Sequence, residues 1–255
     1  METIHIVTAA NNKYAEPLAV MLYSLLKNKT SDMPVKIYII DSRLTFQNKR
    51  KITKAIQPYK SEVKFLKIDS SRYSQLKTSG HLTKETYYRF SIPDILDKTI
   101  QKALYLDCDM VVKGDVTDLW NHDLGNNIVG AVENPGLTHR FKDLSIPETS
   151  KYFNAGVLLI NLKKWREKNM TKHLLHYIKK NHSKIKLCSQ DPLNALLHNK
   201  WLKIDPAWNY QVFRYSDLKI EPSIIHFTTY KKPWEGYKPN FFEEYFKYAE
   251  EAGLN

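Results

Sequence analysis

The sequence predicts an α/β fold built around a mostly parallel sheet. Apolar, β-branched segments alternate with helical segments through the first half of the 255-residue chain, which is the order that βαβ units produce. Asn11, Asp41 and Asp107 each follow a predicted strand, and ligands of such sheets bind beyond the carboxyl ends of the strands. No repeat, low-complexity tract or linker interrupts the sequence, so we expect one domain over residues 1–255.

Apolar periodicity and proline define the first elements. Residues 3–9 are β-branched and alternating, which predicts a strand. Pro17 opens an apolar-periodic stretch to Leu26, as expected of a helix with proline in its first turn. The same criteria predict strands over 35–40 and 63–68 and, between them, a basic amphipathic helix from about residue 45 to residue 56.

Shorter elements follow in the rest of the chain. Asp191 and Pro192 predict the N-cap and first turn of a helix through His198. The other predicted strands cover 103–106, 128–132, 155–161 and 224–227, and the other predicted helices cover 82–90 and 170–180. The polar, irregular segment 135–150 is expected to form a mobile lid. The aromatic and acidic segment 241–255 is expected to form a packing helix and not an electrostatic membrane anchor.

The chain is strongly basic, with a net charge of +12. Such a field favours anionic partners: nucleotide phosphates, nucleic acid or an acidic membrane face. The basic residues are spread through helical stretches, however, so we expect solvated faces and no specific nucleic-acid surface. No apolar run approaches the roughly 20 residues of a membrane-spanning helix, and the N-terminus lacks the signal-peptide pattern. The expected location is the cytoplasm, with at most peripheral association at the inner membrane face.

Several common enzyme signatures are missing. No two glycines are spaced as Gly-x-Gly, which argues against a dinucleotide-binding turn. Gly125 and Gly130 have P-loop spacing, but Ala131 stands where lysine is required. Neither the His-Glu-x-x-His motif nor the Gly-x-Ser-x-Gly motif occurs. Dehydrogenases, P-loop NTPases, zinc proteases and α/β-hydrolases are therefore disfavoured.

Asp107 and Asp109 form the main candidate for a chemical site. They interrupt an apolar run, and at i and i+2 of an extended chain both carboxylates point to the same side while Cys108 points to the other. Two adjacent carboxylates repel and need a cation, and hard oxygen ligands favour Mg²⁺ or Mn²⁺. The alternative is a turn in which the two carboxylates cap loop amides.

His226 and Lys232 extend this candidate site. A histidine on an apolar strand such as 224–227 is ordinarily a core residue. Six residues later, however, Lys232 could reach a phosphate. As a third ligand, an imidazole would favour Mn²⁺ over Mg²⁺.

An ordered set of motifs resembles glycosyltransferase family 8, the retaining family that includes glycogenin and bacterial lipopolysaccharide galactosyltransferases. The matching segments, in chain order, are Ala-Ala-Asn-Asn-x-Tyr at 9–14, His81 with Tyr87 and Arg89, Leu-Tyr-Leu-Asp-Cys-Asp-Met-Val-Val at 104–112, Tyr-Phe-Asn-Ala-Gly-Val-Leu-Leu-Ile-Asn-Leu-Lys-Lys-Trp at 152–165, Gln-Asp-Pro-Leu-Asn at 190–194, and His-Phe-x-x-x-x-Lys-Pro-Trp at 226–234. A single Asp-x-Asp is weak evidence, but this ordered set spans nearly the whole chain.

The resemblance implies a GT-A fold, a Rossmann-like nucleotide-binding sheet with a second layer on the acceptor side. Residues of about 1–112 would bind the nucleotide, and about 113–255 would serve the sugar and the acceptor. The implied activity is retaining transfer of a hexose, galactose or glucose, from a UDP-sugar to a glycan acceptor that is lipid-linked or protein-linked. The implied cofactor is Mn²⁺, with Mg²⁺ possible, held by Asp107, Asp109 and His226.

The resemblance also implies roles for individual residues. The residues expected to bind the donor are Ala9, Asn11 and Tyr14 at the uridine, Arg89, Asn154 and Ala155 at the sugar side, and Lys232 at the diphosphate. Gln190 is expected to face the reacting carbon, and Asp191 to bind sugar hydroxyls and cap the following helix. Because an amide such as Gln190 is a poor nucleophile, we favour same-face attack, with the departing phosphate taking the acceptor proton.

Four positions depart from the family pattern. Asn11 stands where an aspartate usually meets the uracil, and Asn134 and Ser189 replace acidic residues common near the sugar. Thr229 replaces a glycine near the phosphates. These changes leave open a non-catalytic or hydrolytic UDP-sugar-binding protein on the same fold. A third alternative, a basic nucleic-acid-binding protein, predicts salt-dependent binding without metal.

Overall fold

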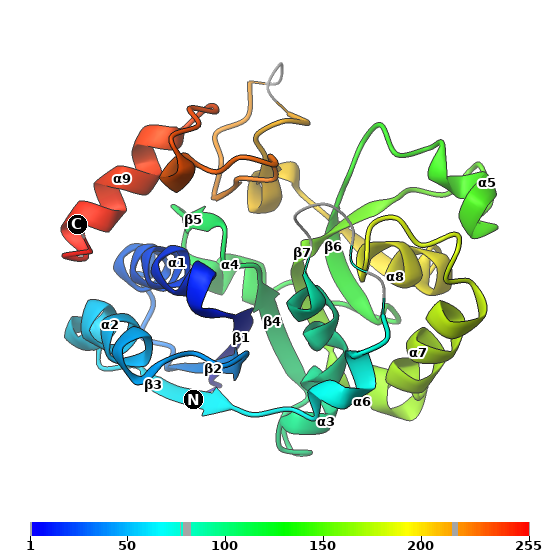
Figure 1. Ribbon diagram of the computed structural model, residues 1–255, viewed down its shortest axis with the longest axis horizontal. Coiled ribbons are helices and arrows are strands. Elements are labelled where there is room, and N and C mark those ends of the chain that lie inside the picture. The colour runs from blue at the N-terminus through cyan, green and yellow to red at the C-terminus, as the bar shows by residue number, and fades with distance from the viewer. Residues whose placement is uncertain (1, 77, 79–82, 216–218, 255) are drawn as a thin grey trace.

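A computed structural model describes residues 2–76, 78, 83–215 and 219–254. Its main sheet has seven strands within these residues, in the order β3-β2-β1-β4-β7-β6-β8. The strands are β1 Ile4–Ala10, β2 Val35–Asp41, β3 Glu62–Leu66, β4 Lys102–Leu106, β6 Val129–Glu133, β7 Phe153–Asn161 and β8 Trp201–Ile204. All neighbouring pairs are parallel except the two that β7 makes with β4 and β6. The predicted mostly parallel α/β sheet is confirmed (Figure 1).

A second, three-stranded sheet lies beside the end of β4. It contains β5 Met110–Val112, β10 Ile224–His226 and β9 Tyr210–Gln211, with β10 in the middle. β10 runs antiparallel to β5, and His226 pairs with Met110. The Phe227 amide donates to the Asp109 carbonyl at 3.0 Å. The small sheet therefore brings His226 next to Asp109 although 117 positions separate them in the sequence, 226 minus 109.

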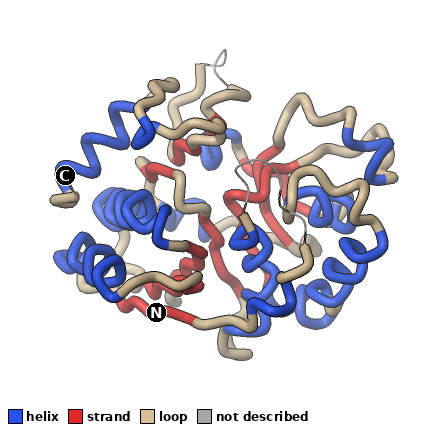
Figure 2. The backbone as a smooth tube through the Cα atoms, in the orientation of Figure 1, coloured by secondary structure: helices blue, strands red, loops and turns tan. Residues whose placement is uncertain are grey.

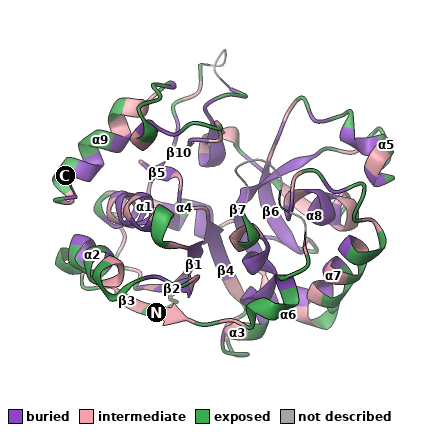
Figure 3. Ribbon diagram, viewed as in Figure 1, coloured by how far each residue is buried: buried purple, intermediate pink, exposed green. Residues whose placement is uncertain are grey.

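Helices cover both faces of the main sheet (Figure 2). Because side chains alternate along a strand, Ile4 and Ile6 of β1 join one core cluster while Val7 and Ala9 join another. The helices that pack into the first cluster are α1 Ala15–Asn28, α2 Phe46–Ile56, α4 Val116–Trp120 and α9 Phe242–Glu251. The helices that pack into the second are α3 Ile92–Ile95, α6 Leu162–Glu167, α7 Met170–Lys180 and α8 Gln190–Leu197. Strands β4, β6 and β7 are consequently buried on both sides (Figure 3).

Most predicted elements are present with shifted ends. The helix around Pro17 begins earlier, at Ala15, and the second helix begins after Thr45, whose hydroxyl caps the Asn48 amide at 3.3 Å. The segment predicted as a helix over 82–90 is a 3-10 helix over Lys84–Ser91; Leu82 and His81 lie outside the described residues. The other 3-10 helices are Asn12–Tyr14, Gln57–Tyr59, Ser70–Tyr73, Pro206–Asn209 and Pro233–Glu235.

The segment 135–150, predicted to be irregular, contains a short helix and several buried apolar side chains. It contains α5, Arg140–Leu144, and its apolar side chains form a small core of their own. The buried members of this core are Leu137, Phe141, Leu144, Ile146 and Tyr152. This part of the chain thus carries a helix and a packed core, where the sequence suggested only a lid.

The two predicted halves share one sheet. β4 of the first half pairs with β7 of the second, with Tyr105 opposite Leu158, so the sheet continues across residue 112. The predicted C-terminal packing helix is α9, which contacts α1 near the start of the chain (Figure 1). Among the helices of the described residues, none has the length and apolar character needed to cross a membrane.

Candidate active site

A cleft of about 290 Å³ lies beyond the carboxyl ends of β1 and β4, the position expected for ligands of such a sheet. It is lined by residues of both halves of the chain. The predicted site residues that line it are Ala9, Asn11, Tyr14, Arg89, Asp107, Asp109, Asn154, Ala155, Gln190, His226 and Lys232. Asp191 does not line it. The fold therefore brings together residues that the sequence placed at six separate motifs.

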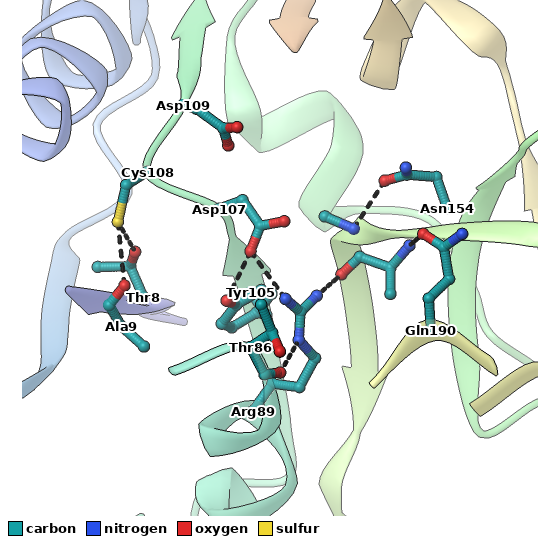
Figure 4. Close-up of polar contacts among 12 residues, drawn as sticks. Thr8, Ala9, Thr86, Arg89, Tyr105, Asp107, Cys108, Asp109, Asn154 and Gln190 are labelled. Atoms are coloured by element: carbon teal, nitrogen blue, oxygen red, sulfur yellow. Dashed lines mark hydrogen bonds and ion pairs between the residues drawn. The ribbon is translucent and has the colours of Figure 1, made fainter. Parts of the chain in front are cut away.

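Asp107 is held by two donors at the floor of the cleft. Its Oδ1 accepts hydrogen bonds from the Tyr105 hydroxyl at 2.7 Å and from Arg89 Nη2 at 3.0 Å (Figure 4). Arg89 is almost fully buried and also donates to the carbonyls of Thr86 and Ala155. These contacts fix the carboxylate and leave Oδ2 without a hydrogen-bond partner among the described residues.

Asp109 faces two further cationic or polarisable groups. Lys232 Nζ lies 2.7 Å from its Oδ2, and His226 Nε2 lies 3.3 Å from its Oδ1. Burial alone would raise the pKa of Asp109, but the charge of Lys232 and the contacts with His226 outweigh it and hold that pKa far below its usual value. Asp109 is therefore an anion in this site.

Cys108 points away from both carboxylates (Figure 4), although Cys108 and Asp109 form a bend between β4 and β5 and not a continuous strand. Its thiol donates to the Ala9 carbonyl at 3.0 Å, and burial raises the pKa of the thiol. Neither neighbouring carboxylate accepts from a loop amide within the described chain, so the alternative of a simple capping turn does not describe this segment.

Asp107, Asp109 and His226 are placed to hold a divalent metal ion. Each can contribute one ligand atom, and these atoms lie within 4.8 Å of one another. Gly156 makes the cluster possible: a Cβ at this position would lie 2.4 Å from His226 Cε1 and 2.9 Å from Asp107 Oδ2. Two carboxylates and one imidazole suit Mn²⁺ better than an all-oxygen set would. The residues present thus fit the predicted ion.

The nucleotide end of the cleft is formed after β1. Asn11 Oδ1 accepts from the Lys13 amide at 3.0 Å and the Tyr14 amide at 3.3 Å, which caps the 3-10 helix and positions Tyr14. Tyr14 in turn packs edge-on against Trp234, with ring centroids 6.0 Å apart. The side-chain carbonyl of Asn11, the residue expected at the uracil, therefore already accepts two backbone hydrogen bonds.

Glu85 is a site residue that the sequence did not indicate. It lines the cleft, and its Oε1 accepts from the Ser42 hydroxyl at 2.6 Å. Burial would raise the pKa of Glu85, but hydrogen bonds from Ser42, Thr83 and Asn11 lower it below its usual value. Glu85 thus places a carboxylate beside Asn11, the position at which the family pattern has an aspartate. This carboxylate comes from a different element of the chain.

Asn154 and Gln190 lie on the sugar side of the cleft. Gln190 Oε1 accepts from the Ala155 amide at 3.0 Å (Figure 4), and the Gln190 side chain also makes a hydrogen bond with Tyr152. Asn154 Oδ1 accepts from the Gly156 amide at 2.8 Å and from Asn209 Nδ2 at 3.0 Å. Both side chains therefore use their carbonyl oxygens to bind backbone amides of β7.

Two side-chain carbonyl oxygens in the cleft have no hydrogen-bond partner among the described residues. Gln211 is fully buried; its Nε2 donates to the Glu133 carbonyl at 3.1 Å, and its Oε1 makes no hydrogen bond. Asn134 Oδ1 is likewise buried and unpaired. Buried polar groups are nearly always hydrogen-bonded, so each of these two oxygens needs a donor, which a water molecule or a ligand in the cleft can supply. Asn134 was noted only as a departure from the family pattern, and Gln211 was not noted at all.

Asp191 lies behind the cleft wall and is fully buried. Its Oδ1 accepts from the Tyr152 hydroxyl at 2.7 Å, and its Oδ2 accepts from Arg140 Nη2 at 2.7 Å. Oδ2 also accepts from the amides of Lys186 and Leu187 at 2.7 and 2.9 Å. The predicted helix cap is corrected: α8 begins at Gln190, and Asp191 binds amides of the preceding loop instead of those of the helix.

This fold and this cleft are those of a glycosyltransferase of the GT-A type. A galactosyltransferase, LgtC, whose structure was solved in complex with donor and acceptor sugar analogs, superimposes with a TM-score of 0.86 at 24% identity, over 98% of this chain and 95% of LgtC. Residues 5–237 match the family model described as Glycosyl transferase family 8. The chain belongs to glycosyl transferase family 8.

Two curated relatives agree with this assignment. General stress protein A of Bacillus subtilis is 34% identical over 97% of this chain and 93% of its own length. The lipopolysaccharide 1,3-galactosyltransferase of Salmonella typhimurium is 30% identical over 75% of this chain and 61% of its own length. The predicted family and GT-A fold are thereby confirmed.

Proposed function

We propose that this glycosyltransferase is a retaining enzyme that moves a hexose, galactose or glucose, from a UDP-sugar to a glycan acceptor. The observation that carries the proposal is the convergence of Asp107, Asp109, His226 and Lys232 on one point of the cleft. Such a mixture of anionic and cationic side chains suits two ligands, a dianionic diphosphate and a divalent metal ion. The names of LgtC and of the Salmonella relative favour galactose.

The metal would be held by Asp107, Asp109 and His226, with Mn²⁺ preferred over Mg²⁺ because of the imidazole. When bound, it supplies positive charge that stabilises the departing diphosphate. Arg89 and Tyr105 keep Asp107 oriented for this purpose. Lys232 supplies a second positive charge to the same phosphates.

The donor would lie along the cleft from Tyr14 to Gln190. Ala9, Asn11, Tyr14 and Glu85 would surround the uridine, so that residues of about 1–112 serve the nucleotide. Arg89, Asn154 and Ala155 would border the sugar, and residues of about 113–255 would serve the sugar and the acceptor. At the mouth, Phe213 leaves 67% of its surface exposed and offers an apolar face on which an acceptor sugar could stack.

Same-face attack is the stereochemical course that fits these residues best. Within the described residues, the carboxylates that line the cleft are Glu85, Asp107 and Asp109, one at the nucleotide end and two at the metal. Gln190 is an amide. The groups that donate hydrogen bonds to Asp191 all lie behind the cleft wall. The bond from the anomeric carbon to the phosphate would break, the acceptor oxygen would bond to that carbon, and the phosphate oxygen would take the acceptor proton.

We place the enzyme in the cytoplasm, with peripheral association at the inner membrane face where its acceptor is lipid-linked. The acceptor itself is a glycan, lipid-linked or protein-linked. The net charge of +12 would favour an anionic surface without requiring nucleic acid.

Transfer assays with a panel of UDP-sugars and glycan acceptors, with and without Mn²⁺, test the proposal. We expect Mn²⁺-dependent transfer of one hexose, with a product that keeps the anomeric configuration of the donor. An inverted product would overturn the retaining assignment. Tight UDP-sugar binding without transfer would favour the binding-protein alternative, and salt-dependent binding of nucleic acid without metal would favour the third alternative.

A further inference from the structure

Asn209 is a fully buried polar residue that connects two sides of the site without touching the cleft. It ends the 3-10 helix Pro206–Asn209 and directly precedes β9. Its Oδ1 lies 2.8 Å from His226 Nδ1, and its Nδ2 lies 3.0 Å from Asn154 Oδ1. One amide therefore contacts both a candidate metal ligand and a residue of the sugar side.

The direction of each hydrogen bond in this chain follows from a backbone amide. The Gly156 N–H lies 2.8 Å from the Asn154 side chain and can only donate, so the atom of Asn154 that it meets is the carbonyl oxygen. That oxygen also faces Asn209, which must therefore donate through its Nδ2. Asn209 then presents its carbonyl oxygen to His226 Nδ1, and a carbonyl oxygen can only accept.

His226 must consequently carry a proton on Nδ1. In a neutral imidazole with Nδ1 protonated, the lone pair is on Nε2, the nitrogen that a metal can take. Nε2 is also the nitrogen that faces Asp109, at 3.3 Å. The hydrogen bond from His226 Nδ1 to Asn209, on the far side of the ring from the metal-binding nitrogen, therefore imposes the tautomer needed for metal binding.

The same chain orients Asn154. Its Oδ1 has two lone pairs, and the Gly156 amide and Asn209 occupy both. The Asn154 Nδ2 group is therefore presented to the cleft that the residue lines. It can donate to a sugar hydroxyl or a phosphate oxygen of the donor.

We propose that Asn209 is a positioning residue that sets the metal-binding tautomer of His226 and, through Asn154, the hydrogen-bond donor offered to the sugar. The second half of this inference, which concerns the donor sugar, rests on the proposed function. The first half concerns the metal alone. Partners of metal-bound histidines in other proteins change metal affinity by roughly 10–100-fold when removed, which sets the size of the expected effect.

The tautomer is tested first on the unmodified protein. ¹⁵N NMR of the histidine rings at about pH 9, where an ordinary imidazole is neutral, should show His226 protonated on Nδ1. In Asn209→Ala the preference for Nδ1–H should be lost, and Mn²⁺ affinity measured by electron paramagnetic resonance should fall roughly 10–100-fold. A His226 without a proton on Nδ1 in the unmodified protein would overturn the proposal.

Asn209→Asp separates the two contacts of the amide. A carboxylate still accepts from His226 Nδ1, so the tautomer and Mn²⁺ binding should persist, with affinity equal or higher because of the added charge. It has no N–H for Asn154, so the extra affinity of a UDP-hexose over UDP should fall about tenfold, as expected for one lost hydrogen bond to a polar ligand. An Asn209→Asp variant that loses Mn²⁺ like Asn209→Ala would contradict the assignment.

Asn194 provides the matched control. It is equally buried, and its side chain bonds the backbone of Phe153 and Gln190 but not His226. Asn194→Ala should lower thermal stability to a similar degree while leaving the His226 tautomer and Mn²⁺ affinity unchanged. If the unmodified protein binds Mn²⁺ with the stated tautomer but binds no UDP-sugar, the proposed function fails and the metal half of this inference stands.

Discussion

Lys232 Nζ lies 2.7 Å from Asp109 Oδ2, and the same ammonium donates to the Phe227 carbonyl at 2.6 Å. Lys232 is almost fully buried, so this ion pair sits in a region of low dielectric where charges interact strongly. The residue proposed to bind the diphosphate therefore contacts one of the proposed metal ligands. The positive charge of Lys232 lies beside the carboxylate that would bind the metal, so this ammonium and the metal ion would compete for Asp109.

Lys232→Met should change the affinities for metal and nucleotide in opposite directions. Removing a like charge beside the cation should raise Mn²⁺ affinity several-fold in the absence of nucleotide. Removing a phosphate contact should lower UDP affinity about tenfold or more, as for a hydrogen bond between charged groups. Isothermal titration calorimetry with each ligand measures both effects.

Lys231→Met is the control for this prediction. Lys231 is the exposed neighbour, and its ammonium makes no ion pair with Asp109, yet the substitution removes the same formal charge. Both affinities should stay within about twofold, because exposed charges are well screened. A Lys232→Met variant with weaker Mn²⁺ binding would show that the ammonium supports the metal site instead of competing with it.

Gly156→Ala should disrupt metal binding through a steric clash. The added Cβ would lie 2.4 Å from His226 Cε1 and 2.9 Å from Asp107 Oδ2, so both ligands must move. We expect a loss of Mn²⁺ affinity of at least tenfold together with about 1–3 kcal/mol of destabilisation from overpacking. Mn²⁺ titration and thermal unfolding of the same sample measure the two quantities.

Gly130→Ala separates crowding from the metal effect. Its Cβ would meet Ile204 Cδ1 at 2.8 Å and Leu124 Cδ2 at 3.0 Å, in the core and away from the cluster. This variant should lose stability but keep its Mn²⁺ affinity. Equal losses of Mn²⁺ affinity in the two variants would mean that the effect of Gly156→Ala comes from general destabilisation.

Gln211→Met should weaken binding of the sugar and not of the nucleotide. The unpaired Oε1 of Gln211 can accept from a sugar hydroxyl, and methionine has a similar volume without the carbonyl. We expect affinity for the preferred UDP-hexose to fall about tenfold, the value of one hydrogen bond, and affinity for UDP to stay the same. If UDP binding falls equally, Gln211 supports the fold of the cleft and does not contact the sugar.

The sequence was sufficient for the parts of this site that follow from local spacing. The i, i+2 relation of Asp107 and Asp109 predicted two carboxylates on one side, and apolar periodicity predicted the main strands. Strands β5, β8 and β9 contain two to four residues each, too few for a period to show. β8 forms by pairing with the five-residue β6, and β5 and β9 form by pairing with the three-residue β10.

Contacts between distant residues were beyond the reach of local spacing. Asn209 is 17 residues from His226 and 55 from Asn154, and Gln211 is 78 from the carbonyl that it binds. Before folding, each is an ordinary polar side chain with nothing to distinguish it. The roles of Asn209 and Gln211 depend on which of their hydrogen-bonding atoms are already used in the folded chain. Only the three-dimensional structure supplies that information.

Asp191 and Arg140 provide the strongest test of the proposed stereochemical course. Both side chains are almost fully buried, and Asp191 holds the loop of Lys186 and Leu187 that leads into Gln190. Asp191→Asn should cost about 1–3 kcal/mol of stability, because it removes the buried one of the two carboxylates that pair with the Arg140 guanidinium and leaves only the part-exposed Asp143. It should also lower turnover by displacing Gln190. Loss of turnover alone would therefore not show that Asp191 is a nucleophile.

A double variant distinguishes positioning from nucleophilic catalysis. Removing both charges of a buried ion pair costs much less than removing one, so Asp191→Asn with Arg140→Met, which keeps a carbonyl acceptor for the amides of Lys186 and Leu187, should recover much of the lost stability. If Asp191 only positions the loop, turnover should recover with the fold to within about tenfold of the unmodified enzyme, a change of roughly 1.4 kcal/mol in activation free energy. If Asp191 forms a covalent bond to the sugar, the double variant should stay inactive however well it folds. Mass spectrometry of the unmodified enzyme with a slow donor should then find the hexose on Asp191, and that result would rule out same-face attack.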